Sequence, residues 1–75
     1  MTRMPSVSGR EVIAALERIG YAVVRQRGSH VRMRHPNDPS RQPVTIPLHR
    51  AVKTGTLHAI LRDANLTVEH LRELL

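Results

Sequence analysis

The stretch that decides the fold is residues 21–35, YAVVRQRGSHVRMRH. Residues 21–27 begin with aromatic and β-branched side chains and continue with charged ones, a composition that predicts a β-strand. Gly28 and Ser29 predict a tight turn, and residues 30–35 alternate polar and apolar side chains, as a second strand does. The stretch therefore predicts an antiparallel hairpin.

The second predicted strand has two different faces. Val31 and Met33 lie on one face and are predicted to enter the core, because side chains of a strand alternate between its faces. The opposite face carries the polar residues His30, Arg32 and Arg34. The pattern does not decide which face of the first strand points into the core, because three of its residues suit a core equally well: Tyr21, Val23 and Val24.

A loop and a third strand follow the hairpin. Residues 36–43, PNDPSRQP, are rich in Pro, Asn, Asp and Ser and predict a loop. Residues 44–48, VTIPL, alternate again and predict a strand. Pro47 has no N–H for a sheet ladder, so this strand is expected to lie at an edge of the sheet or to end there.

The first predicted helix precedes the hairpin. Ser8 and Glu11 have the spacing of a capping box at its start, and apolar residues recur behind them at helical spacing: Val12, Ile13, Leu16 and Ile19. Gly20 is expected to end this helix in the left-handed conformation that glycine tolerates.

Two further helices are predicted after the third strand. One begins near Thr54 and ends at Asn65, with an apolar stripe of Leu57, Ile60, Leu61 and Ala64. Thr67 caps a short last helix, whose predicted buried side is Val68, Leu71, Leu74 and Leu75. Residues 1–75 thus form one predicted α+β domain, an α-β-β-β-α order plus a short C-terminal helix. Its three-stranded antiparallel sheet is covered on one face by helices.

The composition favours an anionic partner. Twelve Lys+Arg against six Asp+Glu give a formal charge of +6, and Lys53 is the single lysine among the basic residues. Arginine binds phosphate with two parallel hydrogen bonds and keeps its charge, so nucleic acid or an acidic protein is favoured over a neutral substrate. With one tyrosine as the single aromatic residue, RNA contacts are expected through phosphates, sugars and shape rather than base stacking.

Several classes of protein are not expected. The absence of cysteine excludes disulfides and thiolate metal sites. The five histidines show no metal-ligand spacing on one helix face: His30, His35, His49, His58 and His70. No apolar run suits a signal peptide or a membrane span. A cytoplasmic protein without metal, small-molecule cofactor or membrane partner is therefore expected.

His30 is the candidate for chemistry. Histidine can take and give a proton near neutral pH, and RNA cleaves itself when its 2′-hydroxyl loses a proton and its 5′-oxygen gains one while cations hold the developing charge. Gly28 leaves room for a phosphate beside this histidine, and Ser29 adds a hydroxyl and an N–H. A solvated strand face is the commoner explanation of a histidine among arginines.

Two other features accompany His30. His49 follows the third strand and is its expected distant companion, because the second and third strands are predicted to pair. Lys53 to Thr56, KTGT, stand at the start of a helix, where free backbone N–H groups bind phosphate. Simple capping explains these four residues equally well.

As a set, these segments resemble the HicA (YcfA-like) toxins of bacterial and archaeal type II toxin–antitoxin systems. The resemblance covers most of the chain in the right order. The matching segments are SGREV at residues 8–12, Leu16, Gly20-Tyr21, RQRGSH at residues 25–30, PLH at residues 47–49, GTL at residues 55–57 and ILR at residues 60–62.

The resemblance implies a fold like that of double-stranded-RNA-binding domains and the activity of an mRNA interferase, a ribonuclease that cleaves mRNA without a metal and so inhibits translation. The catalytic histidine of the family maps onto His30, and the implied partner is a HicB antitoxin that covers the active site. RNA binding is expected from Arg25, Arg27, Gly28, Ser29, Arg32, Arg34, His49 and Lys53.

Two alternatives stay open at this point. The same fold and basic face could form an RNA-binding module without catalysis, or a protein-interaction domain whose positive charge serves a partner alone. His30→Ala separates the first alternative from a ribonuclease, and the second predicts no RNA binding at moderate salt.

Overall fold

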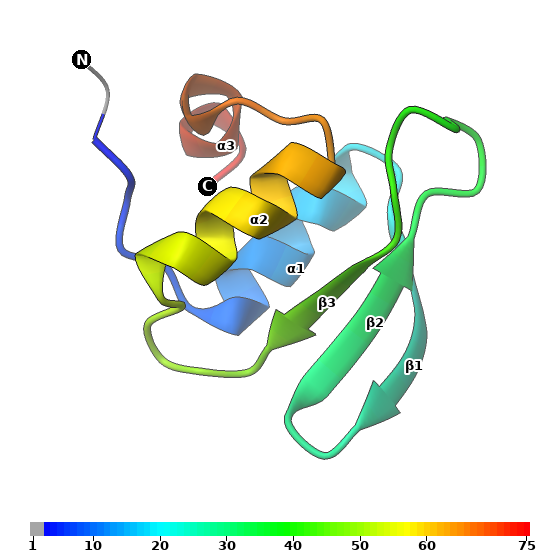
Figure 1. The fold of residues 1–75 in the computed structure, drawn as a ribbon, viewed down its shortest axis with the longest axis horizontal. Helices are drawn as coiled ribbons and strands as arrows, with labels where there is room; N and C mark the ends of the chain where they lie inside the picture. Colours follow the sequence, from blue (N-terminus) through cyan, green and yellow to red (C-terminus); the bar gives the residue numbers. More distant parts are fainter. Residues whose placement is uncertain (1–2) are drawn as a thin grey trace.

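A computed structural model describes residues 3–75 of the chain. Its elements follow the predicted order: α1 (Gly9–Arg18), β1 (Ala22–Arg27), β2 (His30–Arg34), β3 (Val44–Pro47), α2 (Thr54–Asp63) and α3 (Val68–Leu74). The strands form one antiparallel sheet in the order β1-β2-β3. Figure 1 shows the helices gathered on one side of the sheet, with β1 at the edge farthest from them. The predicted α+β fold, including the short third helix, is confirmed.

The core lies between the inner face of the sheet and the helices. Val31 and Met33 on β2 are buried as predicted, and Val44 and Ile46 on β3 join them. The helices contribute the apolar residues whose spacing was predicted, namely Val12, Leu16, Leu57, Ile60, Leu61, Ala64 and Leu71, all buried. The other face of the sheet is left uncovered, so its polar side chains are free to meet a partner.

The helix ends follow the local signals in the sequence. The Oγ of Ser8 accepts from the Glu11 N–H at 3.1 Å, and the Glu11 carboxylate accepts from the Ser8 N–H at 2.9 Å, which completes the capping box. Gly20 has φ +105° at the end of α1, and Asn65 has φ +53° after α2. The Oγ1 of Thr67 accepts from the His70 N–H at 3.0 Å and starts α3.

The buried side predicted for the last helix is wrong in part. Leu75 was predicted to be buried but is 46% exposed, because α3 ends at Leu74 and the last residue lies beyond the helical face. Val68 and Leu74 are partly buried and pack against the core. In the first strand, the structure decides which of the three candidates enters the core. Tyr21 is buried, whereas Val23 and Val24 are about half exposed, at 47% and 52%.

An irregularity in β1 decides which of its side chains share the outer face. The pairing of β1 with β2 shifts between Val23 and Arg25, which leaves Val24 without a partner residue. Such a bulge inserts one residue and reverses the alternation beyond it. Arg25 consequently lies opposite Arg32, and the next arginine, Arg27, lies opposite His30. Without the bulge, strict alternation would have placed Arg25 on the same face as Val23, which is the inner face of the sheet.

The hairpin turn is short and is held by the segment that follows β3. Gly28 has φ +55° and, with Ser29, connects paired residues of β1 and β2; glycine at the first central position is typical of a type II′ turn. The Leu48 N–H donates to the Ser29 carbonyl at 2.7 Å. The turn is therefore bound to the segment that follows β3.

Within residues 3–75, no helix has the length and apolar character needed to cross a membrane.

Candidate functional site

The first part of the candidate site lies on the outer face of the hairpin. A hollow of about 130 Å³ is lined by two arginines of β1, by His30 and Arg32 of β2 and by one residue of β3: Arg25, Arg27, His30, Arg32 and Thr45. The bulge at Val24 is what makes this possible, because it turns the two β1 arginines to the same face as His30. Residues from three strands therefore meet around one histidine.

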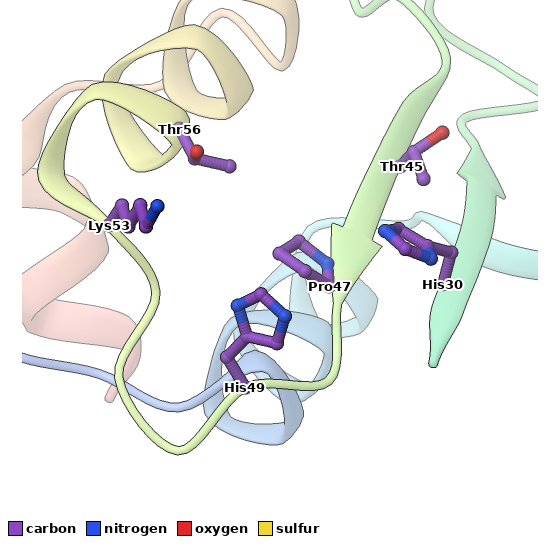
Figure 2. Close-up of a pocket in the computed structure, with 6 residues that line it drawn as sticks. All are labelled: His30, Thr45, Pro47, His49, Lys53 and Thr56. Carbon is purple, nitrogen blue, oxygen red and sulfur yellow. The ribbon is translucent and has the colours of Figure 1, made fainter. Parts of the chain in front are cut away.

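The second part lies between β3 and the start of α2. This hollow of about 270 Å³ is lined by His30, Thr45, Pro47, His49, Lys53 and Thr56. Figure 2 shows these six side chains, with Pro47 between the two histidines and with Lys53 and Thr56 on the opposite wall. The two hollows share His30 and Thr45. Together we call them the basic cleft.

The two histidines of the basic cleft have free rings. His30 is the first residue of β2 and lies opposite Pro47 in the sheet, and His49 follows Pro47 by two residues. Both side chains are exposed. Neither ring takes part in a hydrogen bond or an ion pair with any group of residues 3–75. Each ring is therefore available to a bound molecule.

The cations of the basic cleft are unequal. The Nη1 of Arg32 donates to the Thr45 hydroxyl at 3.0 Å, and this arginine is half-buried, so its guanidinium is held in place. Arg25, Arg27 and Lys53 are exposed and have no carboxylate within 4.0 Å among residues 3–75. These three positive charges are not neutralised from within the described chain and favour an anionic ligand.

The start of α2 differs from the starts of the other helices. Its N-cap residue, Lys53, makes no side-chain capping bond, and its first turn has no acidic residue. By contrast, α1 and α3 are both capped by a hydroxyl and both carry a glutamate in the first turn. The N–H groups at a helix start attract anions, and at α2 neither a capping hydroxyl nor a carboxylate competes for them. Lys53 and Thr56 bring this helix end to the basic cleft.

The first residue of α1 fixes the backbone beneath the basic cleft. The Gly9 N–H donates to the His49 carbonyl at 2.9 Å. A Cβ atom at Gly9 would lie 2.0 Å from the Pro47 carbonyl oxygen, so no other residue fits without movement of the backbone. Gly9 was not among the predicted site residues, although it belongs to the SGREV segment. The sequence does not reveal which distant backbone approaches it.

The structure brings together most of the predicted site residues. Those that line the basic cleft are His30, Arg25, Arg27, Arg32, His49 and Lys53. Gly28, Ser29 and Arg34 are exposed but do not line either hollow. Thr45 was missed, although the alternation of VTI could have placed it on the outer face. Within residues 3–75, no three His, Cys, Asp or Glu side chains are grouped so that they could hold a metal ion.

The fold and the basic cleft define a small α+β protein whose histidines and cations line two adjoining hollows, one on the outer face of the sheet and one between β3 and the start of α2. The sequence model of a family described as the HicA toxin of bacterial toxin–antitoxin systems matches residues 9–66, which include the whole basic cleft. The chain belongs to this family. Its predicted membership is thus confirmed, and it implies action as a toxin together with an antitoxin partner. A comparison with curated proteins finds no match.

Proposed function

We propose that this toxin is an mRNA interferase, an endoribonuclease that cleaves mRNA in the cytoplasm without a metal or other cofactor and so inhibits translation, with His30 as a general acid/base. The observation that carries the proposal is the position of His30. Its free ring forms the shared wall of two hollows that are also lined by cations. A proton carrier beside charge stabilisers is the arrangement that phosphodiester cleavage requires.

The other residues of the basic cleft then hold the phosphate. Arg25, Arg27 and Arg32 provide guanidinium groups on one side of His30, and the start of α2 provides Lys53 and backbone N–H groups on the other. Charge that develops on the phosphorane oxygens is stabilised by such fixed donors. His30 moves the proton, since arginine keeps its own proton at any cellular pH.

The proposed partner is a HicB-like antitoxin. Membership of the HicA toxin family implies an antitoxin partner in general, and the formal charge of +6 favours a partner with an acidic surface. An antitoxin that covered the basic cleft would neutralise its cations and exclude RNA at the same time.

A cleavage assay with purified protein tests the proposed activity. A defined RNA is incubated in excess EDTA with the parent, with His30→Ala and with His58→Ala; His58 is an exposed histidine of α2 that does not line the basic cleft. We expect His30→Ala to cleave at least about 100-fold more slowly, the usual size of a general acid–base contribution, with RNA affinity largely kept. His58→Ala should cleave as the parent does.

Each other outcome changes the conclusion. Equal cleavage by His30→Ala and the parent would show that His30 is not the proton carrier. Loss of parent activity in EDTA would point to a metal mechanism. RNA binding by the parent without any cleavage would favour the non-catalytic RNA-binding module.

The phosphate contacts are tested by the salt dependence of RNA binding. Each lost contact to a single strand lowers the slope of log K against log salt by about 0.7. We expect this change for Arg25→Ala, whose side chain lines the basic cleft, and no change for Arg18→Ala, whose side chain donates to the Leu74 carbonyl and lines neither hollow. A slope for Arg25→Ala equal to that of the parent would place the RNA elsewhere on the surface.

A further inference from the structure

Histidine occurs twice in the basic cleft, on opposite sides of one proline. His30 lies opposite Pro47 in the sheet, His49 lies two residues after it, and both rings line the same hollow of about 270 Å³. Figure 2 shows the His30 ring coming from β2 and the His49 ring coming from the segment after β3, with Pro47 between them. A ligand seated over Pro47 would have one imidazole on either side.

Cleavage of RNA at a 2′-hydroxyl moves two protons in different directions. One leaves the attacking 2′-oxygen and the other reaches the departing 5′-oxygen, so two groups that exchange protons near neutral pH make the reaction efficient. We propose that His49 is the second proton carrier and works with His30 across Pro47. This inference rests on the ribonuclease activity proposed above and names the group that the activity still lacks.

The other residues around the hollows suit this task less well. Guanidinium groups keep their protons at any cellular pH, a lysine ammonium ordinarily releases its proton near pH ~10.4 and a threonine hydroxyl does not ionise in this range. No carboxylate lines either hollow. Histidine, with an ordinary pKa near ~6.5, therefore supplies both proton carriers.

The backbone that carries His49 is held firmly, while its ring is exposed. The His49 carbonyl accepts from the Gly9 N–H at 2.9 Å, and the neighbouring Leu48 N–H donates to the Ser29 carbonyl at 2.7 Å. Further along the same segment, the Val52 N–H donates to the Val7 carbonyl at 2.8 Å. A free ring on a fixed backbone is the combination that a proton carrier needs.

The proposed reaction is balanced without an added reactant. The 2′-oxygen attacks phosphorus and forms a P–O2′ bond while the P–O5′ bond breaks. One neutral imidazole accepts the proton of the 2′-hydroxyl, and the other, which starts protonated, gives its proton to O5′. The products are a 2′,3′-cyclic phosphate and a 5′-hydroxyl, and proton exchange with water restores the two rings.

The test compares cleavage rates of the full chain over a range of pH for the parent, His30→Ala, His49→Ala and His58→Ala. We expect a bell-shaped profile for the parent, since one ring must be neutral and the other protonated. His49→Ala should be slower by at least about 100-fold and should lose one limb of the bell. His49→Asn, which keeps a polar side chain of similar reach, should behave as His49→Ala does, and thermal unfolding should confirm that both variants are folded.

A substrate with sulfur in place of the 5′-oxygen assigns the two directions. A thiolate leaves without protonation, so the variant that lacks the acid should recover most of its rate on this substrate. Recovery by His49→Ala would make His49 the acid, whereas recovery by His30→Ala would make His49 the base.

Three results would overturn the inference while the parent still cleaves RNA. They are a parental rate in His49→Ala, a slow His49→Ala that keeps both limbs of the profile, and the failure of both alanine variants to recover on the sulfur substrate. A slow variant with both limbs would mean that His49 contacts phosphate alone. If the parent itself cleaves no RNA, the proposed function fails, and this result is distinct from all three.

Discussion

A histidine lies at each end of the second strand, since His30 is the first residue of β2 and His35 directly follows its last, and the structure uses the two rings in opposite ways. At one end, the His30 ring is exposed and bonded to no group of residues 3–75. At the other end, His35 is half-buried, its Nε2 lies 2.7 Å from the Ile19 carbonyl oxygen, and its Nδ1 lies 3.0 Å from the Asp38 nitrogen. The ring also meets Tyr21 edge-on, with centroids 5.4 Å apart.

These bonds fix how the His35 ring holds its proton. The Ile19 carbonyl can only accept, so Nε2 carries the hydrogen, and Nδ1 must then accept from the Asp38 N–H. A ring that is committed in this way joins α1 to the loop after β2 and has no nitrogen left for a substrate. A histidine beside arginines is therefore a candidate for chemistry when its nitrogens are free, and a structural residue when both are bonded.

The largest expected effect concerns the backbone at the cleft end. Gly9→Ala should lower the free energy of unfolding by about 3 kcal/mol, toward the upper end of the usual cost of overpacking, because the new Cβ would lie 2.0 Å from the Pro47 carbonyl oxygen. Urea unfolding measures the effect. Gly55→Ala is the matched control, since it is also in the first turn of a helix and its Cβ would meet no atom within 4 Å. Similar losses in both variants would show that the Gly9 contact is not limiting.

The same contact marks where sequence-based prediction ends. The helix caps at Ser8 and Thr67 and the turn at Gly28 were predictable, because each depends on residues a few positions apart. The close approach of Gly9 to Pro47 joins segments that lie far apart in the chain, and no local pattern encodes it. The family resemblance included Gly9 without giving the physical reason for it.

The basic cleft was predictable in part for the same reason. Alternation along β2 was enough to place His30 with Arg32. The positions of Arg25 and Arg27 on the same face depend on the bulge at Val24. The strand contains no glycine or proline that would have indicated a bulge in the sequence. The position of β1 also explains why Tyr21 is buried and Val23 is not. β1 is the strand farthest from the helices, and Tyr21, which directly precedes it, reaches the core.

The free ring of His30 and the bonded ring of His35 should contribute differently to stability. His35→Ala should lower the free energy of unfolding by about 2 kcal/mol, because it leaves the Ile19 carbonyl and the Asp38 N–H without their partner. His30→Ala, at an exposed position with no such bonds, should change it by less than about 0.5 kcal/mol. Urea unfolding at pH 7 measures both changes. Equal losses in the two variants would contradict the distinction between a bonded and a free ring.

A smaller effect is expected at the tyrosine that packs on His35. The Tyr21 hydroxyl donates to the Gln42 carbonyl at 2.7 Å, so Tyr21→Phe should cost about 1 kcal/mol. Burial raises the pKa of Tyr21 above its ordinary 10.0, opposed by Arg41 and assisted by Asp63 and Asp38. A raised pKa in the folded state means that this contribution is complete below pH 10 and is lost as the pH rises through the folded value. The alkaline loss of stability should be weaker in Tyr21→Phe, as thermal unfolding between pH 8 and 11 would reveal.

The smallest effect lies in the loop that His35 holds. The pKa of the exposed Asp38 carboxyl is lowered from 3.8, first by the side-chain hydrogen bond from Ser40, then by the Ser40 N–H, with a further contribution from Arg41. A lowered pKa in the folded state contributes stability that is present above the unfolded value and is lost as the pH falls through the folded one. The parent should therefore be slightly more stable than Asp38→Asn at pH 6, and the difference should disappear as the pH falls below about 3.8. Thermal unfolding of both proteins between pH 2 and 6 tests this expectation, and a difference that persists unchanged at pH 2 would mean that the side-chain shape of Asp38, rather than its charge, stabilises the loop.

Because this loop lies at the end of β2 where the His35 ring is bonded, neither Asp38→Asn nor Tyr21→Phe should alter RNA cleavage. A loss of cleavage in either variant would show that the two ends of the strand are coupled.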